Sequence, residues 1–217
     1  MENIKDVCSR FWNKQQRNCR LPRWEELPDI ELYMDQVITL MGKFTPVFAH
    51  DGENVLTSSM INNYVKLNII PPPVKKKYSK VHISHLIIIC AMKPVLPIQL
   101  IGALIEYLLR SKTEAELLDF FAEQYEHTYI NISDILRESV ESVTENDTNI
   151  NRILALTVMQ AAAVSSGSKI LAENALAEMQ RLDVLKTPSG SDDTKEKREK
   201  EVKKKEKEKE KELSSVK

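Results

Sequence analysis

The stretch that decides the fold runs from residue 56 to residue 79 and reads LTSSMINNYVKLNIIPPPVKKKYS. Its hydroxyl residues at 57–59 are good helix N-caps, because their side-chain oxygens accept hydrogen bonds from the free N–H groups of a first turn. Apolar residues then recur at helical spacing, which predicts a short helix over 57–67. Pro71-Pro72-Pro73 ends this helix and forces an extended exit. A loop of three lysines follows.

These residue types suit a nucleic-acid surface. A helix N-terminus attracts phosphate, Ser and Asn reach phosphates or base edges, and lysines add charge that is independent of base sequence. The candidate DNA-contacting residues are Thr57, Ser58, Ser59, Asn62, Asn63, Tyr64, Lys66, Lys75, Lys76, Lys77, Tyr78 and Lys80. Two alternatives stay open. A tyrosine at such positions more often packs in a core than contacts DNA, and lysines 75–77 could form a merely solvated loop.

The charge of the chain is balanced in total but not along its length. With 31 basic and 32 acidic side chains over 217 residues, the total at first excludes a plainly basic nucleic-acid binder. Residues 57–93, however, carry six lysines and no acid, between a segment 25–56 with seven acids and one base and a segment 94–191 with 14 acids and seven bases. The basic block favours anion binding. We expect about four to six phosphate contacts per chain and a steep fall of affinity with salt.

Helical patterns surround the quoted stretch. They predict helices over 29–44, after Ser79, after Pro97, from Thr113 to about Tyr125, from Ile132 to Val143 and from Ile150 to about Leu185, the last weakened at 165–168. The start signals are N-caps, helix-initiating prolines and the capping box Thr113-Glu114-Ala115-Glu116. Asp29 and Glu31 suit the first turn of the first of these helices. Charge and proline interrupt the apolar stretch 86–109, which we therefore interpret as buried core. The predicted fold class is all-α.

The quoted stretch resembles the winged helix-turn-helix of the MerR family of transcription regulators. Residues 60–64 fall on that family's second helix, Asn68-Ile69-Ile70-Pro71-Pro72 on its Gly-Leu-Leu-Pro turn, and Lys76-Lys77-Tyr78-Ser79 on the exit of its basic wing. Residues 96–101 resemble the opening of its fourth helix. The resemblance implies a MerR-like winged helix-turn-helix that contacts DNA through the second helix. The loop is too short for a full hairpin, so the wing is shortened, and Asn68 tolerates the left-handed backbone of the family's Gly.

Residues 21–180 also resemble an uncharacterised bacterial family called domain of unknown function 1836, through Leu21-Pro22-Arg23-Trp24 and Met60–Pro73. We divide the chain into an N-terminal arm (1–20), a winged helix-turn-helix-like domain (21–110), an acidic helical dimerisation or effector region (111–186) and a disordered Lys/Glu-rich tail (187–217). The alanine-rich helix from residue 150 could pack within the chain or form a dimer seam, and the pattern alone does not choose between them.

The patterns together predict a cytoplasmic DNA-binding transcriptional regulator that binds double-stranded DNA as a homodimer through its C-terminal helices. The alternative is a non-enzymatic protein-interaction module that keeps the winged-helix frame without DNA. The charged start, residues 1–6, argues against a signal peptide, and three cysteines suit a reducing compartment. We expect no membrane association. We also expect neither enzyme activity nor a cofactor, because enzyme motifs are missing. We also expect no metal site, since His82 and His85 have no third ligand in sequence reach.

Overall fold

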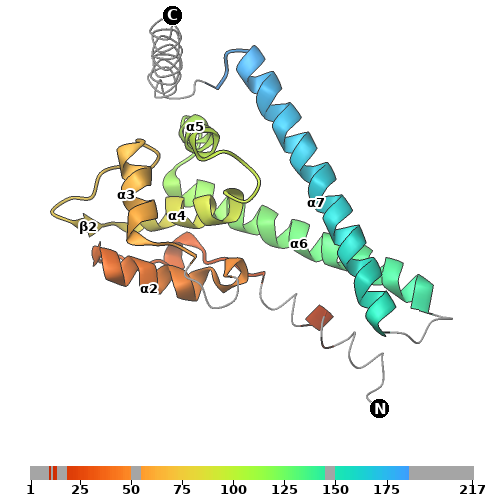
Figure 1. Ribbon diagram of the computed structural model, residues 1–217. Helices are drawn as coiled ribbons and strands as arrows, with labels where there is room; N and C mark the ends of the chain where they lie inside the picture. Colours follow the sequence, from red (N-terminus) through yellow and green to blue (C-terminus); the bar gives the residue numbers. More distant parts are fainter. Residues whose placement is uncertain (1–9, 11, 14–18, 50–54, 145–149, 186–217) are drawn as a thin grey trace, which may run out of the picture. The chain divides into compact units, whose positions relative to one another are not determined.

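A computed structural model of the chain describes residues 10, 12–13, 19–49, 55–144 and 150–185. Within these residues the fold is all-α, as predicted, with six α-helices and one two-stranded sheet (Figure 1). Two short 3₁₀ helices, η1 (Trp24–Glu26) and η2 (Pro46–Phe48), lie in the connections. Residues 50–54 and 145–149, most of the predicted N-terminal arm and the predicted Lys/Glu tail fall outside the described residues.

The first predicted helix begins later than the sequence indicates. Residues Leu32–Tyr33 form strand β1, and helix α2 spans Met34–Phe44 rather than 29–44. The strand pairs antiparallel with β2 (Lys77–Tyr78), so that Leu32 lies opposite Tyr78. Gln36 then accepts a hydrogen bond from the Tyr33 N–H at 2.9 Å and starts the helix. Pairing with a strand 45 residues further along the chain therefore overrides the local helical pattern.

Helix α3 spans Ser58–Lys66 and confirms the predicted short helix. Thr57 is its N-cap, and its Oγ1 accepts a hydrogen bond from the Met60 N–H at 3.3 Å. Asn68 adopts the left-handed conformation, with φ of 55°, as predicted. The Ile69 N–H donates to the Tyr64 carbonyl at 2.9 Å, and the Asn68 N–H donates to the Val65 carbonyl at 3.0 Å. These two bonds are those of a Schellman helix ending.

The loop after the three prolines is a two-residue hairpin turn. The Val74 and Lys77 backbones exchange two hydrogen bonds, at 3.1 Å and 2.9 Å. Lys75 and Lys76, between them, both have positive φ, 49° and 64°. This is the geometry of a type I′ turn, which normally selects Asn-Gly. The loop is therefore as short as predicted, and two lysines occupy strained backbone positions.

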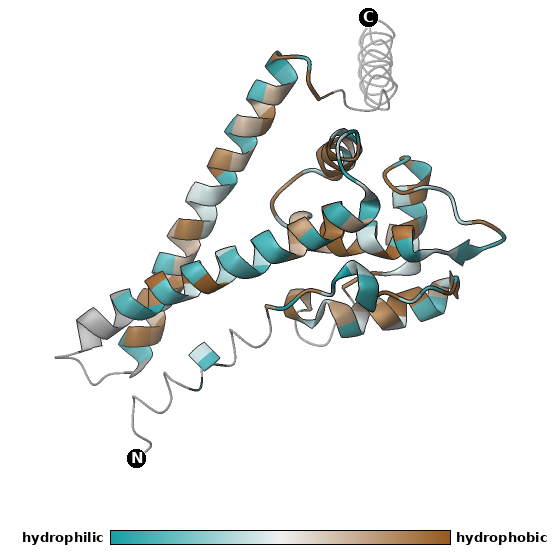
Figure 2. Cartoon of the chain, turned by 180° about the vertical axis from the view of Figure 1, so that it is seen from behind, coloured by the Kyte–Doolittle hydropathy of each residue, from teal (hydrophilic) through white to brown (hydrophobic). Residues whose placement is uncertain are grey.

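Helix α4 (Lys80–Met92) is the central element of the core. Ser79 is the N-cap of this helix, as predicted. Helix α4 packs against α2 and β2, and also against two helices that follow it, α5 (Ile98–Leu108) and α6 (Glu114–Thr144). Every side chain from 82 to 90 is buried, so the helix is covered on all sides rather than along one stripe. Figure 2 shows the hydrophobic residues gathered on α4 and α5. The prediction that this apolar stretch forms the core is confirmed.

Two long helices complete the described fold. Thr113 starts α6 through the predicted capping box, in which the Thr113 N–H donates to Glu116 at 2.8 Å. The helix is continuous from Glu114 to Thr144, so the prediction of two separate helices is wrong. Residues 126–131 contain neither Pro nor Gly to interrupt it. Helix α7 (Ile150–Arg181) is likewise continuous through Gly167 and packs against α6.

One hydrophobic core joins the regions that the sequence divides at residue 110. Leu117, Leu118 and Ala122 of α6 and Leu176 of α7 belong to the same buried cluster as α2 to α5. A smaller cluster joins α6 and α7 to the N-terminal arm through Trp12, Leu136 and Ile153. The division at residue 110 does not separate two cores.

A polar clamp fastens the segment before η1 to α6. Glu126 accepts two hydrogen bonds from the Arg23 guanidinium, at 3.0 Å and 2.8 Å, and one from the Leu21 N–H at 2.8 Å. Asp119 accepts a further bond from the Trp24 N–H at 2.7 Å. Bidentate Arg–carboxylate pairs are among the stronger polar contacts in proteins. The clamp therefore fixes residues 21–24 across the fold.

Candidate nucleic-acid interface

Helix α3 presents one polar face and one apolar face. Ile61 and Tyr64 are buried against the core. The opposite face is exposed and carries hydroxyl, amide and ammonium groups but no carboxylate, from Thr57, Ser58, Ser59, Asn62, Asn63 and Lys66. Six of the predicted contact residues therefore share one accessible surface with donors and acceptors suited to base edges and phosphates.

The lysine turn, residues 74–77, is the second part of the candidate site. Lys75 and Lys76 are exposed at its tip. Lys77 is half-buried, with its Nζ 5.6 Å from the centre of the Tyr33 ring on the paired strand. Figure 1 shows α3 and this turn at the same end of α4, joined by only residues 67–73. Nine of the twelve predicted contact residues thus lie on α3 or on the turn and retain some exposure.

The other three predicted contact residues, Tyr64, Tyr78 and Lys80, are less accessible than these nine. Tyr64 is 6% exposed and Tyr78 is 3% exposed. Burial raises the pKa of both phenols. Lys80 is held by Asp29 at 2.8 Å, with its Nζ 5.1 Å from the centre of the Trp24 ring. An aromatic ring gains more from the core than from water, and the lysine already has a carboxylate partner.

Lys93, the last lysine of the basic block, also makes a contact within the fold. The Lys93 ammonium donates a hydrogen bond to the Val55 carbonyl at 2.7 Å. Together with Lys80, this lysine supports the fold rather than the surface of α3. The positive charge available to a ligand therefore comes from Lys66, Lys75 and Lys76, with a contribution from half-buried Lys77.

Sequence reasoning missed the role of two histidines on α4. His82 and His85 are both buried. His82 accepts a hydrogen bond from the Ser79 N–H at 2.9 Å, as the third residue after the N-cap. His85 contacts Glu114 of α6 at 2.8 Å. The spacing Ser-x-x-His, in the place where Ser-x-x-Glu forms a capping box, was the available signal.

Other chemistry among the described residues is limited. No group of three or more His, Cys, Asp and Glu residues comes together there. Cys19 and Cys90 are buried thiols without a disulfide. Burial raises the pKa of Cys90 to about 12, which leaves almost no thiolate at neutral pH.

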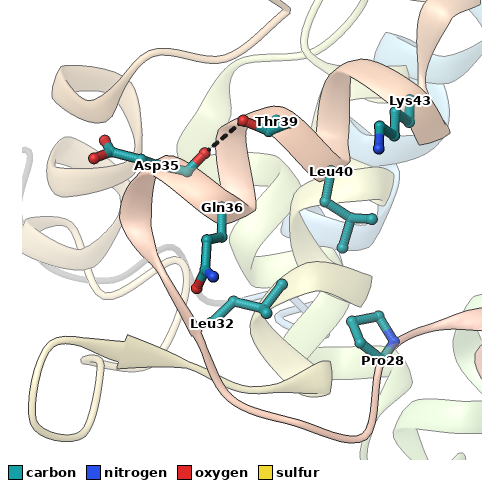
Figure 3. Close-up of a pocket in the computed structure, with 7 residues that line it drawn as sticks. All are labelled: Pro28, Leu32, Asp35, Gln36, Thr39, Leu40 and Lys43. Atoms are coloured by element: carbon teal, nitrogen blue, oxygen red, sulfur yellow. Dashed lines mark hydrogen bonds between the residues drawn. The ribbon is translucent and has the colours of Figure 1, made fainter.

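A shallow groove of about 390 Å³ lies beside α2. Figure 3 shows Pro28, Leu32 and Leu40 facing one space, while Gln36 and Lys43 lie along the same helix. Ile30 and Tyr33, near one end of α2, are more than half exposed. The groove contains none of the predicted DNA-contacting residues.

Helix α7 exposes apolar side chains along much of its length. Those most exposed are Leu154, Val158, Met159, Ile170 and Leu171. By length and composition alone, Asn151–Arg181 would suffice to cross a membrane, with a mean hydropathy of 1.3 and 11% of that window buried. A single such helix is a weak indication, because core helices pass the same test. Figure 2 shows hydrophobic and hydrophilic residues interleaved along α7.

Fold and surface together define the class of protein: an all-α protein that presents a polar helix face and a strained lysine turn. Residues 22–132 match the family described as domain of unknown function (DUF1836), and the chain belongs to that family. The resemblance to this family that the sequence showed is thereby confirmed over residues 22–132. Nothing matches the chain among curated proteins or among solved structures.

Proposed function

We propose that the protein is a DNA-binding transcriptional regulator whose α3 enters the major groove. In this proposal α2, α3, the small sheet and α4 act as a MerR-like winged helix-turn-helix, and the lysine turn is its shortened wing. One observation carries the proposal. The exposed polar face of α3 carries hydroxyl, amide and ammonium groups and no carboxylate, and a lysine turn stands at the same end of α4. Such a surface matches phosphates flanking base edges.

The charge of the turn gives the decisive test. We replace Lys75 and Lys76 by Gln, which removes two charges and leaves equally strained residues in the turn. If each lysine neutralises one phosphate, the slope of log affinity against log salt should become shallower by about 1.8. Binding to labelled genomic DNA fragments is measured by fluorescence anisotropy at several salt concentrations.

A matched control removes two charges elsewhere. Arg110 and Lys169 are exposed on other parts of the fold, and each lies near a glutamate of its own chain. Their replacement by Gln should leave the salt slope of DNA binding unchanged. The proposal fails if the turn variant and this control bind DNA with the same affinity and slope as the natural chain.

We further propose that α7 of a second copy covers the exposed apolar face of α7. A regulator that reads two half-sites needs two copies of its reading helix, and the alanines near Gly167 would let two helices approach closely. Replacing Val158 and Ile170 by Glu should convert a dimer to a monomer in light scattering. The matched change Asn174→Glu, at an exposed polar position, should not. A monomeric natural chain would contradict the proposal.

The groove on α2 supports a second candidate function, a protein-interaction module without DNA binding. Apolar surface beside exposed Ile30 and Tyr33 is typical of a contact surface for another protein. A natural chain that binds no genomic fragment at low salt would favour this module over the regulator.

A further inference from the structure

His82 is a buried titratable side chain at the point where the lysine turn joins α4. It is 5% exposed. Its Nδ1 accepts the Ser79 N–H at 2.9 Å and lies 2.8 Å from Ser79 Oγ. Its ring packs edge-on against the Tyr78 ring, with 5.3 Å between the centroids. One imidazole therefore holds the last residue of β2 and the N-cap of α4 together.

Only the neutral imidazole fits these contacts. A backbone N–H always donates, so Nδ1 must be the acceptor and the single proton belongs on Nε2. Nε2 is buried and makes no hydrogen bond of standard geometry, although the Pro71 and Pro72 backbone carbonyls interact with the imidazole. A second proton would occupy Nδ1 and face the Ser79 N–H. Ser79 Oγ could turn to receive this proton, but the Ser79 N–H would then lose its acceptor.

The position on the helix adds to this penalty. His82 lies in the first turn of α4, where the unpaired backbone N–H groups give the helix end a partial positive charge. An imidazolium at that end is repelled, whereas the same cation at a helix C-terminus would be stabilised. Protonation therefore weakens the N-cap both by losing an acceptor and by adding charge of the wrong sign.

Burial lowers the pKa of His82, and the neighbouring His85 adds to this, while the Pro71 and Pro72 backbone and Glu31 oppose it. The folded-state pKa is thus below the unfolded value of about 6.5. In that case the unfolded chain binds more protons than the folded chain below neutral pH. The contribution of His82 to stability is present above about pH 6.5 and is lost as the pH falls through the folded-state pKa.

We propose that His82 is a proton-operated latch for residues 74–78: neutral His82 holds the lysine turn on α4, and protonated His82 releases it. The positive φ values of Lys75 and Lys76 mean that the released turn can relax to a less strained backbone. The consequence for DNA rests on the proposed function, because the released segment is the one assigned to phosphate contacts. The latch itself does not depend on that assignment.

The ionisable groups around His82 on α4 and the neighbouring elements are Tyr78, Glu31, Lys80 and His85. Two of these are held by acids, His85 by Glu114 and Lys80 by Asp29.

The first test follows the latch directly, without DNA. The imidazole of His82 in the full-length labelled chain is titrated by NMR, while the amide signals of Lys77 and Tyr78 are recorded. These amide signals should move with the same midpoint as the imidazole. In the variant His82→Gln, whose amide oxygen can accept the Ser79 N–H but does not titrate, they should stay constant. Turn signals that ignore the His82 titration in the natural chain would overturn the proposal, even if the variant fails to fold.

The second test measures DNA affinity on both sides of the transition. Each pH unit below the folded-state pKa should lower the affinity of the natural chain about tenfold, because the binding-competent fraction falls in that proportion. His82→Gln should lose this dependence, and His85→Gln should keep it. A surface histidine would act in the opposite direction, since added positive charge tightens DNA binding. Affinity that rises in acid would overturn the latch, whereas absence of DNA binding at every pH would refute only the proposed function.

Discussion

Replacing Lys75 and Lys76 by Asn and Gly should stabilise the protein and weaken its binding to DNA. Both lysines have positive φ, 49° and 64°, in a two-residue turn closed by Val74 and Lys77. The left-handed backbone costs most L-residues roughly 1–2 kcal/mol each. Asn-Gly is the pair that this turn type prefers. The substitution therefore relieves strain at two positions at once.

The size of the gain follows from two opposing terms. Relief of strain at both residues contributes about 2–4 kcal/mol, but Asn also retains part of its penalty. The added glycine makes the unfolded chain more flexible, which costs about 0.5–1 kcal/mol. We expect a net stabilisation of about 1–2 kcal/mol, or a rise in Tm of roughly 2–8 °C.

Two measurements on the same variants separate strain from charge. Urea unfolding gives the free energy of unfolding, and fluorescence anisotropy gives the DNA affinity at several salt concentrations. The Asn-Gly and Gln-Gln variants lose the same two charges, so they should share one DNA affinity. Only the Asn-Gly variant should be stabilised. A free energy of unfolding that is equal for both variants would refute the strain argument, and DNA affinity equal to that of the natural chain would refute the assignment of the turn to phosphate.

Two further substitutions test the frame of the fold. Glu126→Gln should lower the free energy of unfolding in urea by about 1–3 kcal/mol, because the partly buried Arg23 loses its charged partner. The control Glu123→Gln, at an exposed position, should change the free energy of unfolding little. Equal effects of the two substitutions would contradict the clamp. Gly167→Ala should stabilise α7 by about 0.5–1 kcal/mol, since an added Cβ meets nothing within 4 Å. The same change at Gly102 should gain less, because its Cβ would lie 3.2 Å from the Ile69 side chain, and a larger gain there would contradict this packing.

Local chemistry made several features predictable from the sequence. Thr57, Ser79 and Thr113 each stand where a helix begins, because a side-chain oxygen beside free N–H groups acts over only three residues. Asn68 takes the left-handed conformation for an equally local reason. The polar face of α3 follows from its helical spacing alone.

The features that could not be predicted from the sequence depend mostly on contacts between residues far apart in the chain. The start of α2 depends on the pairing of Leu32 with Tyr78, which a window of neighbouring residues cannot contain. Tyr78, the partner in that pair, is buried and is therefore not part of the exposed surface of the candidate interface. Lys80 likewise forms a salt bridge with Asp29, which is 51 residues away in the sequence. The continuity of α6 was hidden because the polar residues near 127 resemble a loop in composition while nothing in them breaks a helix.

The number of lysines left available on the surface lets the salt dependence of DNA binding test the proposed dimer. The basic block offers three exposed lysines and one half-buried lysine rather than six, which gives about three phosphate contacts per chain and a salt slope near −3. Two chains would give about six contacts and a slope near −5, enough to lose roughly a thousandfold in affinity between 50 and 200 mM salt. The slope of log affinity against log salt therefore depends on the number of chains bound to the DNA as well as on the number of charges in each chain. A slope near −3 in a protein that is dimeric by light scattering would mean that only one turn reaches the DNA, and the proposal that the dimer reads two half-sites would then be wrong.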